Sequence, residues 1–295
     1  MQKNDRVIDR FMETKLILFE GIPGSGKSTM AHKTALILNK HRVPNSFYRE
    51  GCLHPANLDG YVVLTPEELE VLLQKFPKYT ERIRSHLVCM DGLILVQRQK
   101  DYRADSQIFR FLEQYAIWDS GLDFDLFAKL HRERWSSFSK NAVIKKETSI
   151  FECAFLQDHI TELMLFYEKS ESEIMEYFKA LEETILPLNP FLIYLQQNCV
   201  EETIGRISRQ RIQEPDGRPW AERVAEMVSM SPYGKAHELI GYAGMVEFFK
   251  RRKDMDLKVL SSLKLRHVFI DNDDYDWKRM QGGVFDVIED LIHSR

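Results

Sequence analysis

The sequence is poor in cysteine and shows none of the spacings that cysteine uses in metal sites or disulfide frameworks. Four cysteines occur among 295 residues. They are far apart and form no CxxC pair, which excludes a zinc ribbon or a small disulfide scaffold. We expect reduced thiols, as is ordinary for a cytoplasmic protein, at Cys52, Cys89, Cys153 and Cys199.

Long apolar runs and an excess of basic charge are also missing. No stretch approaches the roughly 20 apolar residues that a membrane-spanning helix needs. The segment Met1–Arg6 carries charges where a signal peptide would be apolar. The formal net charge of −4 gives no general basic surface for nucleic acid. These absences predict a cytoplasmic protein with neither a membrane nor a nucleic acid as partner, and they leave a homodimer open.

A glycine-rich motif stands near the start of the chain, between a predicted strand and a predicted helix. It reads Gly-x-x-x-x-Gly-Lys-Ser over residues 21–28, after the apolar run Lys15–Phe19 and before the predicted helix Lys27–Lys40. In this context the motif is typical of a loop that binds nucleoside triphosphate. Lys27 is expected to span the β- and γ-phosphates and Ser28 to hold Mg²⁺. The residues expected to line the nucleotide site are Gly21, Ile22, Pro23, Gly24, Ser25, Gly26, Lys27, Ser28 and Thr29.

Further short apolar runs alternate with helical patterns, which predicts an α/β fold with a parallel sheet. The fold expected is the three-layer fold of the P-loop NTPases, with five strands and with helices on both faces of the sheet. A final helix is predicted at Trp277–Ile292. The strands after the first are predicted at Ser46–Tyr48, Ser149–Phe151, Pro190–Leu195 and His267–Ile270.

Residues 52–146 interrupt this alternation and predict an insertion of helices and a hairpin in a single domain of residues 1–295. Thr65-Pro66-Glu67-Glu68 is a capping box that should start a helix. Asp91-Gly92, between two apolar runs, favours a type I′ turn. Two aromatic-rich helices are expected at Gln107–Trp118 and Phe124–Phe138.

Two carboxylates and two arginines are candidates for chemistry. Glu50 follows the second predicted strand and is either a general base or a solvated loop residue. Glu152 ends the third strand and either helps to hold Mg²⁺ or caps the next helix. Arg206 and Arg209 are either catalytic groups of a lid-like region, residues 206–235, or an exposed helix face.

The sequence resembles the thymidylate kinase and deoxynucleoside kinase group of P-loop kinases. The resemblance is carried by Phe19-Glu20-Gly21 leading into the glycine-rich motif, by Tyr48-Arg49-Glu50-Gly51, by the stretch Phe191–Ile207 and by His267–Asp271. It implies the strand order 2-3-1-4-5 and a loop after the fifth strand near the base of the donor nucleotide. It also implies ATP and Mg²⁺ as cofactors.

The chain departs from this group at two places on the acceptor side. Cys153-Ala154-Phe155 follows Glu152 where the group carries an arginine, and residues 52–146 are longer than the matching segment. The leading hypothesis is an ATP-dependent phosphotransferase that moves the γ-phosphoryl group to a small hydroxyl- or phosphate-bearing acceptor, first a nucleoside or nucleotide. A regulatory or signalling ATPase, or a kinase of an antibiotic or another hydroxylated metabolite, remains an alternative.

Overall fold

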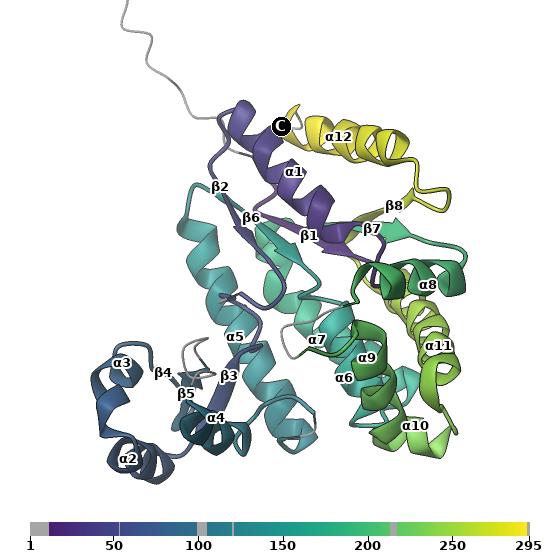
Figure 1. Ribbon diagram of the computed structural model, residues 1–295. Helices are drawn as coiled ribbons and strands as arrows, with labels where there is room; N and C mark the ends of the chain where they lie inside the picture. The colour runs from purple at the N-terminus through teal and green to yellow at the C-terminus, as the bar shows by residue number, and fades with distance from the viewer. Residues whose placement is uncertain (1–11, 53, 99–104, 120, 213–216, 294–295) are drawn as a thin grey trace, which may run out of the picture. The chain divides into compact units, whose positions relative to one another are not determined.

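The computed structural model describes residues 12–52, 54–98, 105–119, 121–212 and 217–293. Two compact units form from them (Figure 1). The first contains the chain up to Glu50 together with the chain from Ser139 onward, and the second is Gly51–Phe138. Among the described helices none has the length and apolar character needed to cross a membrane. The four cysteines, all in the described part of the chain, form no disulfide.

The first unit is built on a five-stranded sheet in which every neighbouring pair is parallel. Its strand order confirms the predicted 2-3-1-4-5, and the fold is α/β. The central strand β1 is fully buried, as its continuous apolar run requires. The order across the sheet is β2 (Asn45–Tyr48), β6 (Thr148–Glu152), β1 (Leu16–Glu20), β7 (Phe191–Gln196) and β8 (Arg266–Asp271).

Helices cover both faces of this sheet and make the fold three-layered (Figure 1). The side chains of Ile17 and Phe19 alternate with those of Leu16 and Leu18 along β1, so each face receives its own apolar row. The first pair belongs to one core with the apolar faces of α1 (Lys27–Lys40) and α12 (Trp277–His293). The opposite face carries α6 (Gln157–Leu165), α7 (Glu171–Ile185) and α11 (Gly241–Ser262).

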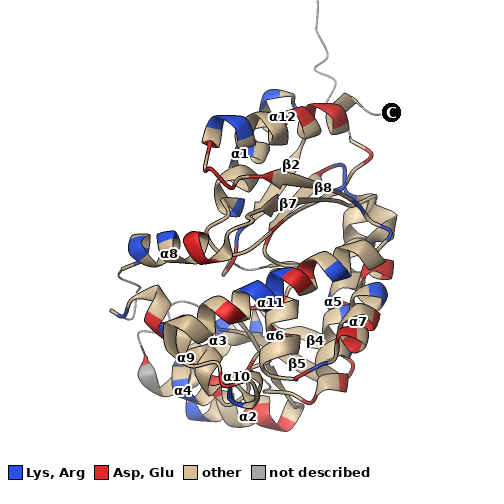
Figure 2. Ribbon diagram, turned by 90° about the vertical axis from the view of Figure 1, so that its right-hand side faces the viewer, with Lys and Arg blue, Asp and Glu red and all other residues tan. Residues whose placement is uncertain are grey.

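Among the described residues, three helices connect β7 to α11, and they cover most of the expected lid region. These helices are α8 (Val200–Gln210), α9 (Trp220–Met230) and α10 (Pro232–Ala236). The first turn of α8 is acidic and its last turn basic, which suits the helix dipole and is visible in Figure 2. Trp220 of α9 stacks on Phe249 of α11, with ring centroids 6.2 Å apart. Residues 213–216 of the expected lid lie outside the described residues.

The second unit contains an antiparallel sheet of three strands in the order β3-β5-β4. The predicted hairpin is confirmed, since Asp91 and Gly92 both have positive φ, as a type I′ turn requires. The strand β3 (Tyr61–Leu64) was missed in the sequence, although a short apolar run between Asp59-Gly60 and Thr65-Pro66 is consistent with a buried strand. The other elements are β4 (Val88–Met90), β5 (Leu93–Gln97), α2 (Pro66–Lys75), the short 3₁₀ helix η1 (Pro77–Tyr79), α3 (Thr80–Arg84) and α4 (Ser106–Glu113).

The predicted capping box at Thr65 is confirmed, because its side chain and that of Glu68 exchange hydrogen bonds with each other's backbone N–H. Two predicted helix ends were wrong. The helix α4 stops at Glu113 rather than at Trp118. The long helix α5 (Phe124–Ile144) runs past the predicted Phe138, and so its residues belong to both units. Helix ends depend on packing as much as on local pattern.

Candidate functional site

The glycine-rich loop joins β1 to α1 at the carboxyl edge of the parallel sheet, where open α/β sheets bind ligands. Gly21, Gly24 and Gly26 have φ values of 143°, 86° and 101°. A β-carbon on Gly21 would lie 2.7 Å from the Leu195 carbonyl oxygen, which is closer than real contacts allow. Only glycine therefore fits at Gly21, and loops of this kind can direct successive backbone N–H groups toward one anion.

The N-terminus of α1 has the features of an anion site. Gly26 is its N-cap residue and provides no side chain to bind the first N–H groups. No acidic residue stands in the first turn of this 14-residue helix. The positive end of its dipole and its uncapped donors thus remain for an external anion.

Lys27 lies over the loop and is 5% exposed. Its Nζ donates to the carbonyl oxygens of Gly21, at 3.0 Å, and of Ile22, at 2.9 Å. The ammonium group is therefore held beside the first two residues of the loop. A phosphate bound here would compete with these two carbonyl oxygens for the N–H donors of Lys27.

Ser28, Glu50 and Glu152 come together beside the loop. The Ser28 hydroxyl donates to the Glu152 carboxylate, which is buried at the end of β6. One ligand atom from each of Glu50, Glu152 and Cys153 lies within 4.8 Å of the other two. Oxygen donors of this kind suit Mg²⁺, so the residues present fit the cation expected from the sequence.

Cys153 follows Glu152 in a left-handed conformation, with φ of 64°. Its backbone N–H donates to the Phe19 carbonyl oxygen at 3.1 Å. Burial raises the pKa of its thiol well above the usual range. The side chain that replaces the expected arginine is therefore a neutral, buried thiol.

Glu20, which sequence reasoning missed, is a buried carboxylate directly before the loop. It accepts hydrogen bonds from the backbone N–H groups of Phe155 at 2.8 Å, Leu156 at 2.9 Å and Gln157 at 3.1 Å. It thus caps the start of α6 from the end of a neighbouring strand. Burial raises the pKa of Glu20 to about 7, against the opposing effect of these donors and of Lys27. The sequence did offer one signal for Glu20, because it follows an apolar strand as Glu50 and Glu152 do.

The helix α8 packs on the loop through Thr203 and Ile207, against which a β-carbon on Gly24 would lie at 3.3 and 3.2 Å. Arg206 is half-buried, and its Cζ lies 3.2 Å from the ring centroid of Tyr275 in the loop after β8. Arg209 is exposed in the last turn of α8. The two arginines therefore have different surroundings, although they stand on one helix.

A chain of buried amide contacts, also missed from the sequence, supports the loop from β7 and β8. Asn272 donates through Nδ2 to the Ser25 carbonyl oxygen at 3.0 Å. Gln197 donates to the Asn272 carbonyl oxygen at 2.7 Å and accepts from the Thr203 hydroxyl at 2.9 Å. The loop is thus held by side chains that follow both neighbouring strands.

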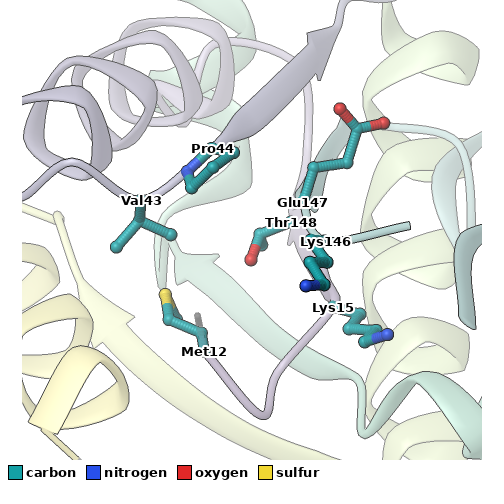
Figure 3. Close-up of a pocket in the computed structure, with 7 residues that line it drawn as sticks. All are labelled: Met12, Lys15, Val43, Pro44, Lys146, Glu147 and Thr148. Atoms are coloured by element: carbon teal, nitrogen blue, oxygen red, sulfur yellow. The ribbon is translucent and has the colours of Figure 1, made fainter. Parts of the chain in front are cut away.

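A small pocket of about 70 Å³ lies at the other edge of the same sheet (Figure 3). Lys15, Pro44 and Thr148, which line it, stand at the amino ends of β1, β2 and β6. Ligands of open α/β sheets bind at the carboxyl ends. The glycine-rich loop is therefore the candidate site and this pocket is not.

The solved structures similar to this chain include two kinases that match it over nearly its whole length. The thymidylate kinase from Ehrlichia chaffeensis shares 14% sequence identity at a TM-score of 0.38, with 94% of this chain and 98% of that chain covered. A gluconokinase from Sinorhizobium meliloti 1021 shares 13% identity at a TM-score of 0.33, with 96% and 97% covered. No protein-family model and no curated protein matches the sequence. Because both TM-scores are below 0.5, the fold assignment rests on the strand order and the loop.

Proposed function

We propose that the protein is an ATP-dependent phosphotransferase that moves the γ-phosphoryl group to a small hydroxyl- or phosphate-bearing acceptor. The observation that carries this proposal is the grouping of Lys27, Ser28 and Glu152 around one glycine-rich loop. Such a site neutralises and orients phosphates, which is most of what phosphoryl transfer demands of a protein.

Each of these residues has a role in the proposed reaction. Lys27 leaves the loop carbonyls and donates to the β- and γ-phosphates. Ser28 and Glu152 hold Mg²⁺, which supplies charge neutralisation to the transferring group. The N–H groups at the start of α1 bind phosphate oxygens. The donor is thereby fixed by groups from β1, α1 and β6.

Glu50 is the proposed general base, because it is exposed and shares its surroundings with Glu152. An exposed carboxylate at this edge can accept the proton of an acceptor hydroxyl while the buried Glu152 remains with the cation. A nucleoside or nucleotide is the leading acceptor class, following the resemblance of Tyr48–Gly51 to the thymidylate kinase and deoxynucleoside kinase group. Arg206 and Arg209 would stabilise the transferring group as part of a lid.

The proposal is tested by incubating the protein with ATP, Mg²⁺ and a panel of nucleosides, nucleoside monophosphates and hydroxylated metabolites. Phosphorus NMR and mass spectrometry would detect a phosphorylated acceptor. Lys27→Met is the matched control, and we expect its rate to fall roughly 10²- to 10³-fold with the fold intact, because one charge that stabilises the transition state is removed. ATP hydrolysis that no acceptor changes would instead favour a regulatory ATPase. Equal turnover by Lys27→Met would overturn the role of the loop.

A further inference from the structure

A buried arginine lies beneath the glycine-rich loop, on the helix α11. Arg252 is 0% exposed, although most of the buried face of α11 is apolar. Asp256, one turn further along, is the other charged residue that the described part of α11 buries. The rest of this buried face consists of Gly244, Met245, Val246, Phe248, Phe249, Met255, Val259 and Leu260.

The contacts of Arg252 lead directly to the loop. Its Nη2 donates to the carbonyl oxygen of Gly21 at 3.0 Å and to Oδ2 of Asp256 at 3.3 Å. The hydroxyl of Tyr194, on β7, donates to the same Asp256 oxygen at 2.8 Å. Tyr194 and Asp256 thus orient the guanidinium group, and the guanidinium group holds the first residue of the loop.

This arrangement carries a cost to the stability of the fold. The Nε and Nη1 of Arg252 and the Oδ1 of Asp256 are buried and find no hydrogen-bond partner among the described residues. Unpaired buried donors and charges are costly, and well-packed apolar residues in place of a buried ion pair are often neutral or stabilising. A role in the site is the better explanation for a cation kept at this cost.

The carbonyl oxygen of Gly21 receives two cationic donors, Arg252 and Lys27, each at 3.0 Å. If Lys27 turns to a phosphate, as the proposed function requires, this carbonyl loses one of them. Arg252 cannot turn to the phosphate as Lys27 does, because it is enclosed by the core and paired with Asp256. The Gly21 carbonyl oxygen therefore keeps its hydrogen bond from Arg252, and the backbone at Gly21 stays in place.

We propose that Arg252 is a positioning residue of the phosphate-binding loop, which retains the Gly21 carbonyl so that Lys27 is released to a nucleotide phosphate. The inference rests on the proposed function only as far as nucleotide binding. An arginine suits this task, because its guanidinium group stays charged and presents several donors in one plane. The partner is a nucleoside triphosphate, and the effect is on its affinity and orientation.

The experiment measures the dissociation constant of ATP with Mg²⁺ by calorimetry and with a fluorescent ATP analogue. The main variant is Arg252→Met with Asp256→Leu, which removes both charges together and leaves neither unpaired. Arg251→Met is the matched control, since this neighbouring arginine is only partly buried and pairs with Glu247 on the same helix. Urea unfolding of every variant verifies that each one is folded.

We expect the double variant to bind ATP about 10- to 100-fold more weakly than wild type, as is typical for the loss of a hydrogen bond to a charged group. The control should bind like wild type. In a Lys27→Met background the same double change should have a much smaller effect, because Arg252 acts through Lys27. A purely structural role would weaken binding equally in both backgrounds.

A folded double variant that binds ATP within about twofold of wild type would overturn the proposal, as would equal losses in the two backgrounds. Should the double variant fail to fold, Arg252→Lys takes its place, since the shorter lysine side chain does not bring its ammonium group to the position of Nη2, which contacts both Asp256 and Gly21. Its expected loss is roughly 3- to 10-fold, and unchanged binding would again refute the proposal. Absence of ATP binding by the wild-type protein would count against the proposed function instead.

Discussion

Replacing Glu20 by Gln should change how the stability of the protein depends on pH. The pKa of Glu20 rises from 4.5 to about 7 on folding, chiefly because the carboxylate is buried. A raised pKa means that the folded state binds the proton more tightly, so this group stabilises the fold at low pH and that contribution is lost as the pH rises through 7. At about 1.4 kcal/mol per pKa unit, a shift from 4.5 to about 7 corresponds to about 3 kcal/mol.

The measurement compares wild type with Glu20→Gln by urea unfolding at pH 5 and pH 8. Intrinsic fluorescence and far-UV circular dichroism should give coincident transitions, which verifies two-state behaviour. Because Gln does not titrate, the free energy of unfolding of wild type relative to the variant should fall by roughly 2.5 kcal/mol between the two pH values. A difference that is constant, or that grows with pH, would refute the reasoning. It would show that the three N–H donors and Lys27 keep the carboxylate ionised.

The remaining predictions concern the groups around the loop. Glu152→Gln should raise the Mg²⁺ concentration needed for activity, whereas Glu50→Gln should slow phosphoryl transfer with little change in ATP binding. Titrations of ATP and Mg²⁺ separate these effects, and identical defects would contradict the division of roles. Arg206→Ala and Arg209→Ala should lower kcat more than they raise KM, because a lid contributes mainly in the transition state. Steady-state kinetics with an identified acceptor tests this. Unchanged kcat in both variants would show that the two arginines belong to an exposed helix face and have no catalytic role.

Much of the fold followed from local patterns in the sequence. The helix α1 has the predicted bounds, Lys27–Lys40, and each predicted strand of the parallel sheet exists within a few residues. The turn at Asp91-Gly92 and the capping box at Thr65 were also predictable, because a turn type or a cap is specified by a few neighbouring residues. The strand order came from the resemblance to a kinase group rather than from the pattern itself.

The surroundings of the loop, in contrast, depend on residues that are distant in sequence. The segment 250–253 contains four consecutive basic residues, and no local pattern distinguishes the one that is buried. Arg252 contacts Gly21 across 231 positions of sequence, and Glu20 contacts Phe155 across 135. These contacts exist only because parallel strands end at one edge of the sheet and α11 packs beneath them. The sequence by itself determined the glycine-rich loop between β1 and α1, and the tertiary structure alone decided which buried charges hold it, because burial is a property of the packed chain.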